Sequence, residues 1–177
     1  MVGKLMSENL FEKNLTAMEK WYPKFAEAIR LNRYEKDEIE IITEYSSDGN
    51  LIYKIEKENR ALYLNGKRNT KEPLQMWMKR LGQIHDYAPV ILLGMGSGLY
   101  LKTLVENTSE KVNIVVYEPS VSIFLKTLKM VDLESVILNR PIAFVVEGLN
   151  GNEFEPVIKK LISIETMEFL KQELVIY

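Results

Sequence analysis

The stretch of residues 92–120 constrains the fold of this chain more than any other. It reads LLGMGSGLYLKTLVENTSEKVNIVVYEPS, in which an apolar run gives way to a Gly-x-Gly-x-Gly turn, a helix-like segment and a second apolar run that ends in Glu118. A strand, a glycine turn, a helix and a second strand, in this order, form a mononucleotide-binding β-α-β unit. The sequence therefore predicts parallel strands with a ligand crevice outside their carboxyl ends.

The glycine turn leaves three interpretations open. Gly94, Gly96 and Gly98 follow the spacing of S-adenosylmethionine-dependent methyltransferases, whereas a dinucleotide fingerprint has its third glycine where Leu99 stands. The third interpretation is a turn that only packs its helix closely on the sheet. In the ligand-binding interpretations the helix N-terminus binds an anion, and Glu118 accepts hydrogen bonds from ribose hydroxyls.

The predicted crevice collects residues that follow the first two strands of this unit. The candidate ligands are a nucleotide, a nucleotide-sugar or S-adenosylmethionine, and the loop at 147–150 after the third strand is expected to complete the crevice. The candidate ligand-binding residues are Gly94, Met95, Gly96, Ser97, Gly98, Glu118 and Pro119.

Strands and helices alternate in the second part of the chain. Strands are predicted at 90–93, 112–117, 142–147 and 172–177, and helices at 98–107, 119–130 and 152–163. The strands are nearly continuous apolar runs, as expected when helices cover both faces of a parallel sheet. We therefore predict an α/β fold, a Rossmann-like three-layer sandwich with a mostly parallel, methyltransferase-like sheet. The last strand, ELVIY, ends the sequence without a polar tail, which favours a fragment of a longer protein.

The first part of the chain predicts a helix. Apolar residues within 11–29 recur at intervals of three and four, which places them on one helical face. Ser7 is expected to cap the start of this helix. Pro23 is expected to kink or divide it, because proline removes a backbone donor.

A small antiparallel appendage is predicted next. Residues alternate in polarity on both sides of the turn at 47–50, which contains Asp-Gly and predicts a β-hairpin, and a third short strand is expected at 60–64. Pro73 fits the first turn of a helix that we expect to end near 85–89. We divide the chain into an N-terminal helix plus hairpin, 1–68, and a Rossmann-like domain, 69–177.

Composition narrows the function. The 177 residues are 46% hydrophobic and 27% charged, values typical of a globular domain. A net charge of −2 gives no general attraction to nucleic acid or to an anionic membrane. The chain has no cysteine, which excludes disulfides and thiolate metal sites and agrees with a cytoplasmic location. We expect no metal, no nucleic-acid partner and no membrane association.

Catalytic motifs do not emerge from the sequence. His85 is the only histidine, which excludes a multi-histidine metal site, and its place at a predicted helix end suits a surface residue. Ser97 does not stand in a Gly-x-Ser-x-Gly elbow, so it is interpreted as a turn residue or helix cap. The sequence therefore predicts a binding fold without a catalytic residue.

Four segments, in order, resemble the N-terminal domain of the motility-associated factor (Maf) family. They are NLTAMEKWYPKFAEAI, YLNGKRNTKEPLQMWM, LGMGSGLYLKTLVEN and IVVYEPSVSIFLKTL. Members of that family are bacterial proteins linked to the glycosylation of flagellin with nonulosonic acids. The resemblance implies a non-catalytic Rossmann-like module of a flagellin glycosyltransferase, with the transferase chemistry in a following domain. It implies flagellin and that downstream transferase domain as partners, and Gly94, Gly96, Gly98 and Glu118 as a small-ligand crevice. The alternative is an S-adenosylmethionine-dependent methyltransferase or a remnant of one.

Overall fold

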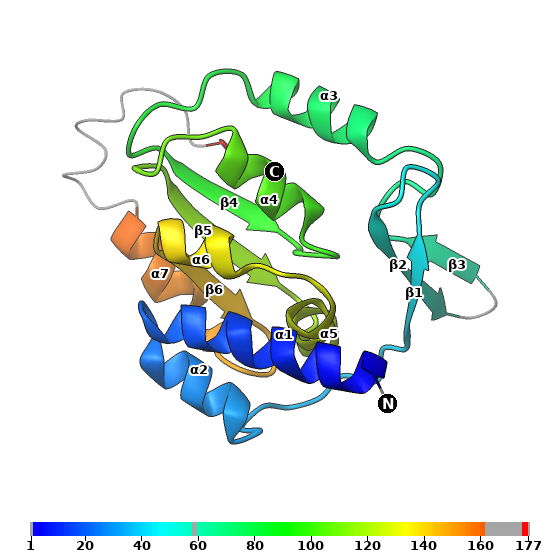
Figure 1. Ribbon diagram of the computed structural model, residues 1–177. Helices are drawn as coiled ribbons and strands as arrows, with labels where there is room; N and C mark the ends of the chain where they lie inside the picture. The colour runs from blue at the N-terminus through cyan, green and yellow to red at the C-terminus, as the bar shows by residue number, and fades with distance from the viewer. Residues whose placement is uncertain (1, 58–59, 162–174, 177) are drawn as a thin grey trace.

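A computed structural model describes residues 2–57, 60–161 and 175–176 of the chain (Figure 1). The helices are α1 (Val2–Glu19), α2 (Pro23–Arg30), α3 (Lys71–Leu81), α4 (Leu99–Glu106), α5 (Val121–Met130), α6 (Glu134–Asn139), the 3-10 turn η1 (Gly151–Glu153) and α7 (Phe154–Leu161). The strands are β1 (Ile41–Tyr45), β2 (Leu51–Lys57), β3 (Arg60–Tyr63), β4 (Pro89–Leu93), β5 (Asn113–Glu118), β6 (Ile142–Val146) and β7 (Val175–Ile176).

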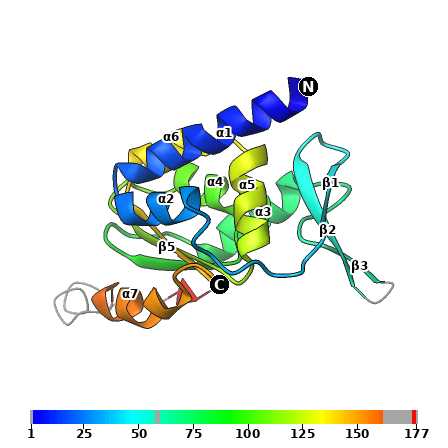
Figure 2. The same ribbon diagram turned by 90° about the horizontal axis from the view of Figure 1, so that it is seen from below.

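A parallel sheet in the order β6-β5-β4-β7 forms the centre of the molecule. The chain passes from β4 to β5 to β6 and then returns to β7 on the other side of β4, so the direction of winding reverses at β4. Right-handed crossovers place α4 and α5 on one face and α7 on the other, and Figure 2 shows α7 across the sheet from α1 and α2. The predicted Rossmann-like α/β fold is confirmed, and its topological switch point lies at the carboxyl end of β4.

The N-terminal helix α1 packs on α5 and α6 and belongs to the same core as the sheet. Leu15 and Met18 are fully buried in one cluster with β4, β5 and β6. Asn14 is also buried: its Nδ2 donates to the carbonyls of Leu128 (2.8 Å) and Val131 (2.7 Å), while its Oδ1 accepts from Leu133 N–H (2.8 Å). These hydrogen bonds of Asn14 fix the position of α1 on the connection between α5 and α6. One buried cluster therefore runs through both of the parts into which we divided the chain at residue 68.

The ends of several helices follow from local chemistry. Pro23 stands at the first position of α2 and separates it from α1, which confirms the predicted division. The predicted cap at Ser7 is wrong, because α1 begins at Val2. The residues between Val2 and Ser7 include no proline that would interrupt the helix. Pro73 lies in the first turn of α3 as predicted, but α3 ends earlier than expected, because Gly82 adopts a φ of +67° directly after Leu81.

The predicted appendage is a three-stranded antiparallel sheet in the order β1-β2-β3. Its first turn contains Gly49 at a φ of +83°, the conformation that the Asp-Gly sequence predicts. Tyr53 attaches the sheet to α5: its ring is fully buried, and its hydroxyl lies 3.1 Å from Thr127 Oγ1. Burial raises the pKa of Tyr53 to about 12. The appendage is thereby held beside the glycine turn, because Thr127 Oγ1 also donates to the Gly96 carbonyl (2.6 Å).

The predicted strand at 172–177 lies largely outside the described residues, and its described part, β7, pairs with β4 as a parallel strand.

Among the helices that the structure describes, none combines the length and the apolar character needed to cross a bilayer.

Candidate ligand site at the glycine turn

The carboxylate of Glu118, at the end of β5, holds the glycine turn that follows β4. Met95 N–H donates to Oε2 (2.6 Å), and Ser120 N–H donates to Oε1 (3.0 Å). The side chain is 1% exposed. Gly96 N–H also lies close to the carboxylate and favours its charged form. The turn and the carboxylate thus meet at one edge of the sheet, as the β-α-β pattern predicts, but Glu118 uses both oxygens within the protein.

Backbone conformation explains why the turn needs its glycines. Gly94, Gly96 and Gly98 have φ values of +82°, +50° and +77°, a region that residues with a side chain rarely adopt. With these angles the amides after Gly94 turn inward, toward the end of β5. Glu118 supplies the acceptor that buried amides require.

Burial raises the pKa of the Glu118 carboxyl above its ordinary 4.5, and the hydrogen bonds from Met95 and Ser120 oppose this rise only in part. Proton binding therefore favours the folded protein. Its stabilising contribution is complete below the unfolded pKa and is lost as the pH rises through the folded pKa. We expect the native protein to lose stability relative to Glu118→Gln as the pH rises above about 4, near the pKa of an unfolded glutamate carboxyl. Urea unfolding of both proteins at a series of pH values measures the difference, and a native protein that gains stability relative to Glu118→Gln as the pH rises would contradict the raised pKa.

A pocket of about 310 Å³ opens beside this turn, at the switch point of the sheet. It is lined by Leu64, Asn65, Trp77, Leu92, Leu93, Gly94, Met95, Gly96, Tyr100, Glu118, Pro119 and Ile123. Of the seven predicted ligand-binding residues, Gly94, Met95, Gly96, Glu118 and Pro119 lie in this lining.

The other two predicted residues, Ser97 and Gly98, do not line the pocket. Ser97 is buried, and its hydroxyl donates to Asn65 Oδ1 (3.0 Å) in the loop after β3. A side chain at Gly98 would lie 3.5 Å from both Leu133 and Thr127, so this glycine faces the core. Ser97 and Gly98 therefore connect the turn to its surroundings.

The sequence did not predict the outer wall of the pocket. Trp77 of α3 and Tyr100 of α4 meet edge to face, with ring centroids 5.0 Å apart and planes at 89°. Trp77 is half-buried and lines the pocket with Leu64 and Asn65. A signal for this wall was present in the YLNG segment and in Tyr100, two residues after the last glycine. The YLNG segment, Trp77 and Tyr100 are far apart in sequence, so the sequence alone did not predict that they line one pocket.

The loop at 147–150 does not complete the crevice, which corrects the sequence prediction. The connection between α2 and β1, residues 31–40, crosses this end of the sheet: Glu35 N–H donates to the Gly148 carbonyl (2.6 Å), and Asp37 Oδ2 accepts from Ser122 N–H (3.4 Å). We call this connection the strap. It occupies the space above β6, so the pocket extends only over β4 and β5.

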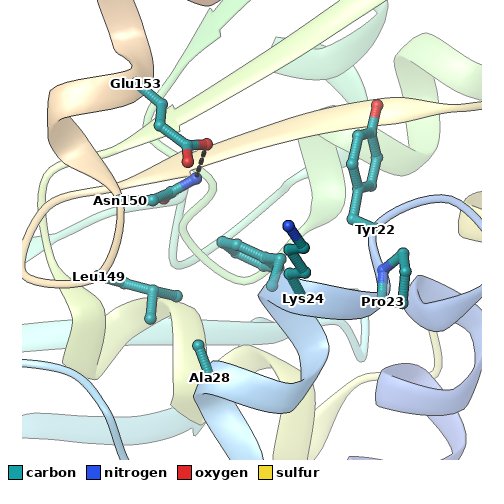
Figure 3. Close-up of a pocket in the computed structure, with 8 residues that line it drawn as sticks. Tyr22, Pro23, Lys24, Ala28, Leu149, Asn150 and Glu153 are labelled. Carbon is teal, nitrogen blue, oxygen red and sulfur yellow. Dashed lines mark hydrogen bonds between the residues drawn. The ribbon is translucent and has the colours of Figure 1, made fainter.

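Asn150 lines a different pocket, of about 420 Å³, between the start of α2 and the loop after β6. Figure 3 shows Asn150 and Glu153 on one side of it, joined by a hydrogen bond of 3.1 Å, and Tyr22 and Lys24 on the other. The Asn150 side chain does not cap η1 but bonds to β6: its Oδ1 accepts from Val146 N–H at 2.8 Å.

Gly148→Ala is expected to lower the free energy of unfolding by about 2 kcal/mol more than Gly49→Ala. Both glycines have similar positive φ values, +79° and +83°, so the cost of the backbone conformation is matched. A methyl group at Gly148 would lie 2.4 Å from the carbonyl oxygen of Glu35, whereas nothing lies within 4 Å of one at Gly49. Thermal or urea unfolding of the two variants compares them, and equal losses would show that the strap does not rest on Gly148.

The described residues include no group of three or more histidine, cysteine, aspartate or glutamate side chains placed to hold a metal ion. His85 is exposed on the connection between α3 and β4. The pocket beside the turn has one carboxylate, that of Glu118, and its acceptor capacity is directed to the backbone. The site therefore offers a ligand a concave pocket, an aromatic wall and nearby polar groups of the backbone.

Comparison with known proteins identifies a solved structure with a similar fold. No protein-family model matches the sequence, and a comparison with curated proteins gives no match. Among solved structures, the Maf glycosyltransferase from Magnetospirillum magneticum AMB-1 is similar, with a TM-score of 0.58 and 15% sequence identity over 88% of this chain. The chain spans 30% of the length of that protein. At this identity the likeness shows a common fold, so the chain has a Maf-like fold.

Proposed function

We propose that this chain is the N-terminal Rossmann-like module of a Maf-like flagellin glycosyltransferase. In this proposal a following domain transfers the nonulosonic acid, and residues 69–177 form most of a pocket for a nucleotide-type ligand. Residues 1–68 brace that pocket and add Leu64 and Asn65 to its lining. The observation that carries the proposal is the fold likeness to a Maf glycosyltransferase over 88% of the chain. The pocket at the switch point, where open α/β sheets bind ligands, supports the ligand-binding role.

The test uses the 177-residue chain with flagellin and a CMP-activated nonulosonic acid. We expect calorimetry to detect binding of flagellin, and mass spectrometry of the same mixture to detect no glycosylated flagellin. A globular protein of similar charge serves as the binding control. Transfer of sugar by this chain would contradict the non-catalytic role, and failure to bind flagellin would contradict the recognition role.

The alternative is an S-adenosylmethionine-dependent methyltransferase, which the Gly-x-Gly-x-Gly turn beside the pocket favours. In that class of enzyme the acid at the end of the second strand binds ribose. Glu118 is 1% exposed and already accepts from Met95 and Ser120 N–H, which counts against this role. Calorimetric titration with S-adenosylmethionine separates the two: micromolar binding that Glu118→Ala abolishes would favour the methyltransferase.

A further inference from the structure

The glycine turn, residues 94–98, directs most of its N–H groups at acceptors within the protein. Gly94 N–H donates to the Tyr117 carbonyl (2.7 Å) and Gly98 N–H to the Met95 carbonyl (2.9 Å). Met95 N–H donates to the Glu118 carboxylate, and Gly96 N–H lies close to the same carboxylate. A phosphate-binding turn leaves such amides directed at the ligand. Here an internal carboxylate occupies the place that a phosphate takes in such a turn.

The charges around the pocket also disfavour an anion. Its lining contains no lysine, arginine or histidine. The start of α5 is satisfied internally, since Ile123 N–H donates to Ser120 Oγ (3.1 Å) and Ser122 N–H to Asp37 (3.4 Å). The carboxylates of Asp37 and Glu118 lie near enough to repel each other, which contributes to the raised pKa of Glu118. A phosphate in the pocket would add a further negative charge close to these carboxylates.

What the pocket does offer suits an uncharged ring. Trp77 and Tyr100 form an aromatic wall, and Leu64 and Ile123 add apolar surface. Three residues of the lining carry hydrogen-bond donors: Trp77 has its indole N–H, Tyr100 its hydroxyl and Asn65 its amide Nδ2. None of these three groups hydrogen-bonds to another residue that the structure describes. They are therefore available to acceptor atoms on a heteroaromatic ring, such as the carbonyl or ring nitrogen of a nucleobase.

We propose that the pocket binds the nucleoside part of a nucleotide-type ligand, with the base against Trp77 and Tyr100 and any phosphate left in solvent. This inference rests on the proposed ligand-binding role and specifies its chemistry. It predicts that a phosphate group adds almost nothing to affinity. It also predicts weak dependence on salt, because no phosphate is neutralised on binding.

Calorimetric titration of the whole chain with cytidine, uridine and adenosine, and with their 5′-monophosphates, tests the inference. We expect at least one nucleoside to bind, its monophosphate to bind less than about fivefold more tightly, and inorganic phosphate not to compete. A monophosphate preference of about fivefold or more, or competition by inorganic phosphate, would overturn it. So would the absence of binding by every nucleoside, or binding of S-adenosylmethionine alone. The scaffold proposal is tested separately by flagellin binding, so each can fail without the other.

Variants locate the binding site. Trp77→Ala is expected to weaken nucleoside and monophosphate alike, by about tenfold. Asn65→Ala leaves the aromatic wall in place and is expected to weaken both by about fivefold. Tyr87→Ala, at an exposed aromatic residue outside this lining, is the control and should leave the affinity unchanged. If both pocket variants bind as the native chain does, the nucleoside does not occupy this pocket and the inference is overturned.

Discussion

Glu118→Ala is expected to lower the free energy of unfolding by about 3 kcal/mol. The substitution leaves the N–H groups of Met95 and Ser120 without their acceptor, although both bonds are buried. It also creates a cavity between the glycine turn and β5. Release of a buried carboxylate offsets part of this loss, because burial raises the pKa of Glu118 and so opposes its ionisation. Urea unfolding measures the net change.

Glu147→Ala is the matched control, because Glu147 directly follows β6, the strand next to β5. Its carboxylate is exposed and accepts from the Tyr117 hydroxyl (2.9 Å) at the surface. The expected loss is about 0.5 kcal/mol. Similar losses for the two variants would show that Glu118 does not hold the turn.

Arg140→Met is expected to cost about 3 kcal/mol of unfolding free energy. The guanidinium is 4% exposed and lies at the carboxyl end of α4. Nη1 donates to the Ser109 carbonyl (2.7 Å), and Nη2 donates to the carbonyls of Val105 (3.1 Å) and Thr108 (2.9 Å). Methionine fills much of the same volume but leaves these carbonyls without their donor, and the bond to Val105 is buried. The favourable charge near the C-terminal end of the helix dipole is lost as well.

Arg33→Met controls for the loss of one positive charge, because Arg33 is exposed on the strap and its side chain forms no hydrogen bond or ion pair with another described residue. We expect it to change stability by less than about 0.5 kcal/mol. Thermal unfolding of both variants provides the comparison. An Arg140→Met protein as stable as Arg33→Met would show that the α4 carbonyls find other donors.

The fold was predictable where local sequence determines the structure. Continuous apolar runs identify β4, β5 and β6, because each is buried on both faces of the sheet. Pro23 and the Asp-Gly turn define element ends through backbone chemistry that needs no tertiary context. The meeting of the glycine turn and Glu118 followed from the parallel order of two consecutive strands.

The remainder of the site depends on contacts between distant segments. The strap covers β6 through the contact of Glu35 with Gly148. The sequence of residues 31–40 is polar and contains no pattern that predicts a position over the sheet. Trp77 reads as an ordinary helical apolar residue until α3 is placed beside α4. Arg140 is a further case, since a lone arginine before a strand gives no sign that it caps a helix more than thirty residues earlier. Hydrophobic periodicity predicts which face of a helix or strand is buried, but it does not predict which other segment covers that face.

The central claim is that the Glu118 carboxylate holds the glycine turn closed through buried hydrogen bonds. Amide hydrogen exchange at Met95 and Ser120, followed by NMR in the native chain and in Glu118→Ala, tests it most directly. The account predicts that both amides, although outside regular structure, exchange as slowly as the Val115 amide in β5, and that Glu118→Ala accelerates the two far more than it accelerates Val115. Exchange of Met95 and Ser120 at the rate of an exposed loop in the native chain would contradict it.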